Sequence, residues 1–254
     1  MPQGNKRAAP QGKAAFGDRL VDEVEKAPLV SRVFSSVASR YDLMNDLMSL
    51  GVHRLWKAAF LDWLRPRPSM RLLDVGGGTG DIAFRFLERG GEDVLVCDAN
   101  RDMLERGRNR AIDRGHLDGI TWIGGDAEAL PIADGAVDAY ATAFCIRNVT
   151  RIPQALAEAR RVLKPGGRFL CLEFSSVRAP ILVRLYDAYS SRVLPALGAG
   201  VAGDRAAYQY LVESIRRFPA QDDFSAMIAA AGLDSVSYRN LSGGIAAIHS
   251  AWRI

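Results

Sequence analysis

Short apolar runs alternate with segments of helical periodicity between residues 71 and 174. The runs predict strands, and the segments between them predict helices because their apolar residues recur every three or four positions. Strands joined by helices pair in parallel through right-handed crossovers, so the chain is predicted to form an open α/β sheet with helices on both faces. The predicted strands are 71–75, 94–98, 120–123, 137–144 and 168–174, and the predicted helices are 81–89, 103–113 and 153–163.

The composition excludes several other classes of protein. The chain has 254 residues, of which 48% are hydrophobic and 24% charged, as in ordinary globular proteins. Its 3 cysteines are scattered and its 3 histidines isolated, so neither a disulfide framework nor a metal site is predicted. The net charge of +4 does not indicate nucleic-acid binding but is compatible with weak attraction to an anionic membrane. Charged residues interrupt the most apolar stretch, 181–201, so no membrane-spanning helix is predicted.

Residues 1–15 predict a disordered leader. They are rich in Gln, Gly, Ala and basic residues, and they contain no acidic residue. They lack the apolar core of a signal peptide, and a mitochondrial presequence is the alternative, although the segment has no serine. With unpaired cysteines that suit a reducing compartment, the expected location is the cytoplasm.

A glycine-rich turn follows the first predicted strand. Gly76, Gly78 and Gly80 let the chain turn tightly and let a ligand approach bare backbone. Their spacing differs from the dinucleotide fingerprint, and Asp74 before them would repel a pyrophosphate while tolerating an amino or sulfonium group. The turn predicts a ligand without phosphates, and a plain strand-to-helix turn is the alternative.

An acid closes the second predicted strand. Asp98 follows the glycine turn at roughly the 20-residue offset at which a carboxylate binds ribose hydroxyls. A carboxylate accepts two hydrogen bonds from a vicinal diol, which predicts ribose binding. Helix capping is the alternative, because Asn100 and Asp102 lie at the same boundary.

A third polar turn follows the third predicted strand. Asp126 can accept a hydrogen bond from an adenine amino group, and the backbone next to it, at Ala127, can donate one to a ring nitrogen. A polar turn without a ligand is the alternative reading of this segment.

These turns at successive strand ends resemble those of the class I S-adenosylmethionine-dependent methyltransferases. Longer segments are similar to the ubiquinone/menaquinone biosynthesis C-methyltransferases, and the likeness runs from roughly residue 16 to the end of the chain. The segments that carry it are 33–46, 147–150, 161–167, 210–215, 218–219 and 240–246.

The resemblance implies a Rossmann-like class I methyltransferase fold. It implies one domain over 16–254, divided into a helical lid (16–65), a cofactor-binding core (66–175), a helical cap after the fifth strand (176–215) and a C-terminal helix with strands (216–254). The implied cofactor is S-adenosylmethionine, with Thr79, Asp98, Asp126 and Ala127 as cofactor positions. Many family members have Ser where this chain has Ala143, so one side-chain hydrogen bond is expected to be absent here.

Family membership implies methyl transfer to a ring carbon of a polyprenylated quinol, either a methoxy polyprenyl benzoquinol or demethylmenaquinol. The ring becomes nucleophilic when a phenol with a pKa of about 10 loses its proton, so a fixed cation is needed. Arg147 is expected to stabilise this phenolate because guanidinium stays protonated, and Asn148 to hydrogen-bond the other quinol oxygen. A structural Arg–carboxylate bridge beside an Asn turn is the alternative for this pair.

Two further residues receive predicted catalytic roles. Tyr41, in the lid, is expected to contact the substrate or the methionine end of the cofactor, and core packing is the alternative. Asp81 is expected to hold the cofactor's amino group or a water beside Arg147, and stabilisation of a helix N-terminus is its alternative role.

An amphipathic pattern over residues 181–210 predicts a helix that either faces the core or caps an apolar channel for the prenyl tail. The expected partners are the quinol lipid, the inner membrane surface through peripheral contact, and a second copy or a quinone-biosynthesis complex. The alternative functions are methylation of another lipid or phenolic acceptor and a non-catalytic scaffold on the same fold.

Overall fold

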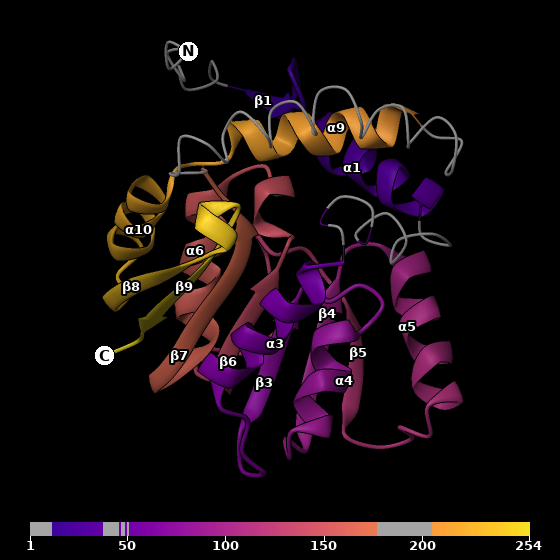
Figure 1. The fold of residues 1–254 in the computed structure, drawn as a ribbon, viewed down its shortest axis with the longest axis vertical. Helices are drawn as coiled ribbons and strands as arrows, with labels where there is room; N and C mark the ends of the chain where they lie inside the picture. The colour runs from indigo at the N-terminus through magenta and orange to yellow at the C-terminus, as the bar shows by residue number, and fades with distance from the viewer. Residues whose placement is uncertain (1–11, 38–45, 47–48, 50, 177–204) are drawn as a thin grey trace.

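The computed structural model describes residues 12–37, 46, 49, 51–176 and 205–254. Its centre is a 7-stranded sheet in the order β5-β4-β3-β6-β7-β9-β8 (Figure 1). Strands β3 to β7 pair in parallel, and β9 pairs antiparallel with both β7 and β8. Their bounds are β3 Arg71–Val75, β4 Asp93–Asp98, β5 Ile120–Gly124, β6 Val137–Ala143, β7 Leu163–Phe174, β8 Asp234–Leu241 and β9 Ala246–Trp252.

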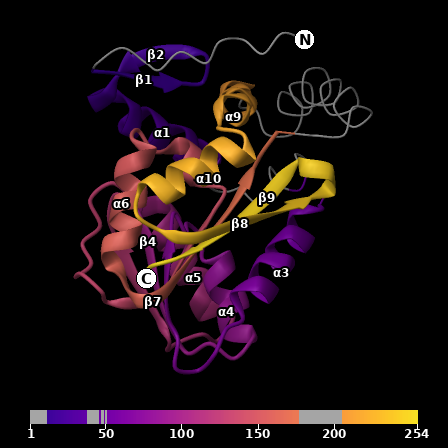
Figure 2. The same ribbon diagram turned by 90° about the vertical axis from the view of Figure 1, so that its left-hand side faces the viewer.

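Helices cover both faces of this sheet (Figure 2). On one face, α3 (His53–Leu64), α4 (Asp81–Glu88) and α5 (Arg101–Asp113) contribute to a cluster that includes Trp56 and Phe60. On the other face, α6 (Ile152–Val162) and α10 (Gln221–Ala230) pack over Tyr140 and Phe169. The predicted mostly parallel α/β sheet with helices on both faces is therefore confirmed, with element ends that differ by a few residues.

The fifth strand begins earlier than predicted. β7 starts at Leu163 rather than at residue 168, and its register against β6 shifts between Val137 and Ala139. Leu163 is fully buried opposite Val137, so tertiary burial extends the strand across a Pro-Gly-Gly segment that reads as a turn in the sequence.

A second layer lies across the carboxyl ends of the parallel strands (Figures 1 and 2). It consists of α1 (Glu23–Val37), α9 (Arg205–Arg217) and a hairpin of β1 (Lys13–Phe16) and β2 (Arg19–Asp22). The predicted leader boundary at residue 15 falls inside β1, because Ala14 and Val21 are buried by contacts that sequence periodicity does not show. The predicted cap boundary at residue 215 likewise falls inside α9.

Helix α3 packs in the core, although it falls within the predicted lid, residues 16–65. Its buried side chains include Trp56, Phe60, Leu61 and Leu64, all packed in the first cluster. Most of the predicted channel-forming segment, residues 181–204, lies outside the described residues. Among the helices that the structure describes, none is long and apolar enough to cross a membrane.

Candidate active site

A pocket opens at the carboxyl edge of the sheet where the strand order reverses between β3 and β6. The acids and turns predicted at successive strand ends meet there, since parallel strands end at the same edge. The predicted site residues that line it are Asp74, Gly76, Gly78, Thr79, Asp81, Asp98, Asp126, Ala127 and Asn148. Gly80 and Arg147 are not among the described residues that line it, and Tyr41 lies outside the described residues.

The glycine turn forms the floor of the pocket. Gly76 has φ +66°, and a Cβ atom at this position would lie 2.1 Å from Cys145 Sγ. Gly78 donates its backbone N–H to Asp98 Oδ2 at 3.0 Å, and Gly80, with φ +80°, precedes the first residue of α4. The turn thus needs glycine both for its left-handed backbone and for the close approach of Cys145.

Asp74 is buried at the end of β3 and faces this turn. The residue lines the pocket and is 1% exposed, and neither carboxylate oxygen has a hydrogen-bond partner among the described residues. Burial raises the pKa of Asp74 to about 8; the carboxylates of Asp98 and Asp81 add to the rise and the ammonium of Lys57 opposes it. A buried acceptor of this kind suits a cationic ligand group that donates hydrogen bonds.

This burial makes a testable contribution to stability. Without cofactor, the folded protein keeps the Asp74 proton up to about pH 8, whereas the unfolded chain loses it near its ordinary pKa of 3.8. The stability linked to this group is complete below that lower pKa and is lost as the pH rises to about 8. Asp74→Asn stays neutral at every pH. We therefore expect the unfolding free energy of this variant, relative to that of the parent, to increase by up to about 1.4 kcal/mol for each unit by which the pH rises.

Denaturant unfolding of both proteins without cofactor, between about pH 5 and pH 8, measures this difference. A difference that stays constant over the range would contradict the burial of an uncompensated carboxyl group.

Asp98 ends β4 beside the glycine turn. Its Oδ1 accepts the Asn100 N–H at 2.8 Å while Oδ2 accepts that of Gly78. Burial raises the pKa of Asp98 to about 6, and these two N–H groups oppose the rise. Asn100, and not Asp98, caps α5 through its side chain on Met103 N, so the capping alternative does not account for Asp98.

We expect Asp98→Ala to weaken S-adenosylmethionine binding by about 1–3 kcal/mol, because the ribose loses its charged acceptor. Isothermal titration calorimetry measures the effect. Asp93→Ala is a matched control, since Asp93 begins the same strand at the opposite edge of the sheet. Equal affinities for the parent and Asp98→Ala would remove Asp98 from the ribose site.

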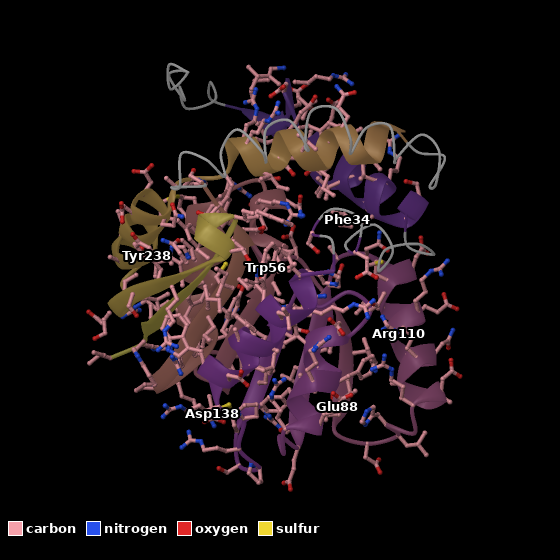
Figure 3. All side chains as sticks on the ribbon, viewed as in Figure 1. Phe34, Trp56, Glu88, Arg110, Asp138 and Tyr238 are labelled. Carbon is pink, nitrogen blue, oxygen red and sulfur yellow. The ribbon has the colours of Figure 1, made fainter. Side chains whose placement is uncertain are left out.

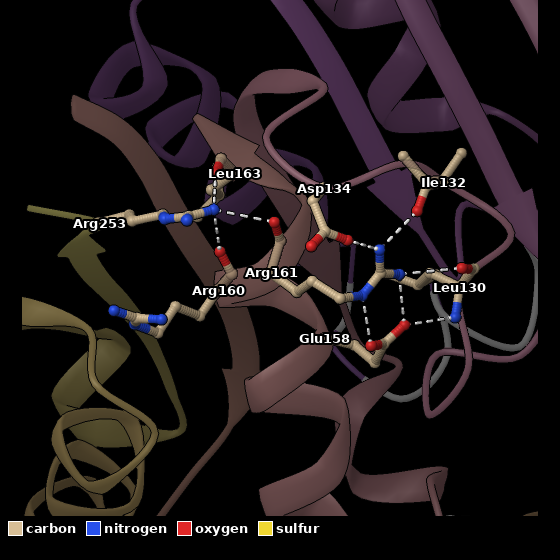
Figure 4. Close-up of polar contacts among 8 residues, drawn as sticks. All are labelled: Leu130, Ile132, Asp134, Glu158, Arg160, Arg161, Leu163 and Arg253. Carbon is tan, nitrogen blue, oxygen red and sulfur yellow. Dashed lines mark hydrogen bonds and ion pairs between the residues drawn. The ribbon is translucent and has the colours of Figure 1, made fainter. Parts of the chain in front are cut away.

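Asp126 and Ala127 line the pocket from the turn after β5. Asp126 Oδ1 accepts the Glu128 N–H at 2.9 Å, which shapes the turn. Buried Glu128 then binds the backbone of Thr150 and Arg151, so it ties this turn to the connection that follows β6. Further along, Arg161 and Glu158 of α6 hold both backbone groups of Leu130 (Figure 4).

The residues after β6 form a strained turn. Phe144 has φ +56°, a conformation that side-chain-bearing residues rarely adopt, and a 3₁₀ helix, Ile146–Asn148, follows it. Arg147 Nη1 donates to Phe144 O at 2.5 Å and to Glu173 Oε1 of β7 at 2.8 Å. The side chains of Arg147 and Glu173 are 3% and 0% exposed.

The structure therefore contains the Arg–carboxylate bridge that the sequence left open as an alternative for Arg147. The bridge holds the turn that carries Asn148. The sequence did not indicate Glu173 as the partner of Arg147, because Glu173 is simply one residue of a buried strand. A direct contact between Arg147 and a phenolate stays a prediction.

Lys57 and Asp81 form a charged pair that lines the pocket, and the sequence did not indicate Lys57. Lys57 of α3 is 5% exposed and its Nζ lies 2.7 Å from Asp81 Oδ2 at the start of α4. Burial raises the pKa of Asp81, but this ammonium, together with Arg85 and Arg110, outweighs burial and lowers the pKa to about 2. Asp81 also contacts Arg85 at 3.3 Å.

Thr79 and Ala143 also line the pocket. Thr79 is buried and its hydroxyl accepts a hydrogen bond from Arg110 at 2.7 Å. Ala143 lines the pocket without a polar side chain. In the part of the chain that the structure describes, no group of His, Cys, Asp and Glu could hold a metal ion.

Solved structures of methyltransferases resemble this chain in fold. The chain superposes on an S-adenosylmethionine-dependent methyltransferase of Thermotoga maritima, described as a possible histamine N-methyltransferase, with a TM-score of 0.63 over 88% of this chain and 99% of that one at 19% identity. A Haemonchus contortus phosphoethanolamine N-methyltransferase with bound S-adenosylhomocysteine gives a TM-score of 0.56 over 78% and 52% of the two chains at 15% identity. The fold is that of the class I methyltransferases, as predicted.

Sequence comparison adds the family. Residues 21–253 match the ubiE/COQ5 methyltransferase family. The chain is 60% identical over 240 residues to "Ubiquinone/menaquinone biosynthesis C-methyltransferase UbiE" of Paracoccus denitrificans, covering 94% of this chain and 96% of that protein. A protein of the same name from Brucella abortus is 55% identical over 244 residues, with 94% and 91% covered. The chain belongs to the ubiE/COQ5 methyltransferase family, which confirms the resemblance, the enzyme class and the dependence on S-adenosylmethionine.

The residues present fit this cofactor. Asp74 offers two buried oxygens to an amino group, Asp98 an acceptor to ribose hydroxyls, and Asp126 an acceptor at the third strand end. Gly76 and Gly78 line the pocket with backbone alone, so a ligand can approach the turn closely.

Proposed function

We propose that this chain methylates a ring carbon of a polyprenylated quinol in ubiquinone or menaquinone biosynthesis. The acceptors are 2-methoxy-6-polyprenyl-benzoquinol, demethylmenaquinol, or both. The observation that carries the proposal is identity of 55–60% along almost the whole chain to proteins named for this C-methylation. The pocket supports it, because it joins the cofactor acids to Asn148 on the turn after β6.

The pocket also has an apolar wall, which suits a prenylated acceptor. Helix α1 contributes Ala27, Val30 and Phe34 to its lining. Figure 3 shows Phe34 below α1, on the side of the carboxyl ends of the strands. Asn100 connects α1 to the core through hydrogen bonds. The Asn100 Nδ2 group donates to Ser31 O at 3.0 Å and to Ser35 Oγ at 3.0 Å.

Bound S-adenosylmethionine supplies an electrophilic methyl group. Asp74 offers its two buried oxygens to the amino group of the cofactor's methionine end, and Lys57 offers its ammonium to the carboxylate group. Asn148 hydrogen-bonds a quinol oxygen, and Arg147 favours the phenolate form of the ring through its positive charge and through the turn it holds. Tyr41 contacts the substrate or the cofactor in this proposal.

Product analysis tests the function. The full-length protein, labelled methyl donor and reduced short-chain forms of the two quinols should yield a C-methylated ring by mass spectrometry. An O-methylated product would favour a different phenolic acceptor, and donor binding without turnover on either quinol would favour a scaffold. Cells lacking the protein should accumulate a demethylated quinone.

A lipid acceptor implies contact with the membrane that holds it. We propose that the protein works in the cytoplasm at the inner membrane surface, alone, as a homodimer or with other quinone-biosynthesis proteins. Co-sedimentation with anionic vesicles carrying the quinol should exceed that with neutral vesicles lacking it, and equal, negligible sedimentation would contradict membrane contact.

A further inference from the structure

Tyr210 of α9 lies behind the turn that presents Asn148 to the pocket. Its hydroxyl donates to Asn148 Oδ1 at 3.1 Å. Tyr210 is 4% exposed and Asn148 9% exposed, so the hydrogen bond forms away from bulk water. A buried hydrogen bond of this kind holds the amide in place, because moving the amide away would leave the buried Tyr210 hydroxyl without this partner.

The hydrogen bond engages the oxygen end of the Asn148 amide. Burial raises the pKa of Tyr210, so its hydroxyl keeps the proton that it donates. With Oδ1 engaged, the Nδ2 group is the branch of Asn148 left for the ligand. No described residue accepts a hydrogen bond from Nδ2, and Asn148 lines the pocket.

The N-terminal hairpin holds Tyr210 from its other side. The ring of Phe16 in β1 stacks on that of Tyr210, with centroids 4.5 Å apart and planes 24° from parallel. Polar contacts fix the hairpin to α9: the Asp18 N–H donates to Glu213 Oε2 at 2.8 Å, and Arg217 Nε lies 3.2 Å from Asp18 Oδ1. The tyrosine ring is therefore braced by a segment far from the site in sequence.

We propose that Tyr210 is a positioning residue that, braced by Phe16, orients the Asn148 amide so that Nδ2 donates to an oxygen of the acceptor ring. The inference rests on the proposed function, since Asn148 must contact the acceptor for its orientation to affect turnover. Tyr210 acts through Asn148 and takes no part in the chemistry itself.

A double-mutant cycle on the full chain tests the proposal. Tyr210→Phe keeps the stacked ring and removes only the hydroxyl, and we expect it to lower kcat about tenfold, the effect of roughly one hydrogen bond. S-adenosylmethionine affinity should change less than about twofold, because the cofactor acids are untouched. In the Asn148→Ala background, Tyr210→Phe should have almost no further effect on kcat.

A second variant approaches Tyr210 from the hairpin. Phe16→Ala removes the stacking partner and should lower kcat by a few-fold, again only when Asn148 is present. Leu20→Ala is the matched control in the same hairpin, since Leu20 is 53% exposed, and it should leave kcat unchanged. Melting temperatures show whether each variant is folded.

The outcomes separate the inference from the proposed function. If the parent protein methylates neither quinol, the proposed function fails. If the parent is active but Tyr210→Phe lowers kcat equally with and without Asn148, Tyr210 does not act through Asn148 and the inference is overturned. Unchanged kcat in Asn148→Ala or in Tyr210→Phe would overturn it as well.

Discussion

Arg147→Ala is expected to lower the free energy of unfolding by about 3–5 kcal/mol and to remove most of the turnover. The substitution leaves Glu173 fully buried without its cationic partner. Burial already raises the pKa of Glu173, and the Arg147 guanidinium is the largest opposing influence. The strained Phe144 carbonyl loses its donor at the same time. Denaturant unfolding and steady-state kinetics measure the two effects.

A compensating pair separates structure from catalysis. Arg147→Met with Glu173→Leu replaces the buried ion pair by apolar side chains and should recover most of the lost stability. Turnover should stay low if the guanidinium stabilises a phenolate, and it should return if Arg147 serves only to hold the turn. A stability loss below about 1 kcal/mol in Arg147→Ala would contradict a buried, interdependent pair.

Gly76→Ala is expected to cost about 2–5 kcal/mol of unfolding free energy and to abolish cofactor binding. A methyl group there would meet Cys145 Sγ at 2.1 Å and Cys145 Cβ at 2.5 Å, on a backbone with φ +66°. The left-handed backbone costs about 1–2 kcal/mol for alanine, and displacing a packed neighbour adds about 1–3 kcal/mol. Thermal unfolding and calorimetric titration with S-adenosylmethionine measure the two losses.

Gly90→Ala is the matched control for this substitution. Gly90 also has a positive φ, +86°, but an alanine methyl group at this position would meet no described atom within 4 Å. The variant should lose only the backbone contribution of about 1–2 kcal/mol and bind the cofactor normally. Equal stability losses in the two variants would show that Cys145 does not restrict the floor of the pocket.

Features that depend on neighbouring residues in the chain were predictable. Strand and helix periodicity is local, and parallel strands that follow one another bring their carboxyl ends to one edge. Asp74, Asp98 and Asp126 could therefore be placed at one ligand site from their positions in the sequence. The longer family segments could be read in the same way.

Features that depend on distant partners were not predictable. The β1–β2 hairpin has little apolar periodicity and is held by α9, about 200 residues away in the chain, through contacts such as Asp18–Arg217. In the sequence, Glu173 is one more residue of a buried strand and Lys57 resembles a surface charge on α3. Only the structure shows that Glu173 pairs with Arg147 and that Lys57 pairs with Asp81.

The order of residues along the chain thus determined the sheet, the edge at which ligands bind and the acids found there, because each follows from spacing within one β–α unit. The tertiary structure alone decided which charges are neutralised and which are left for a ligand. That depends on burial and on partners brought together from separate elements: the pKa of Asp74 rises first because packing removes its water, and then because Asp98 and Asp81 lie nearby.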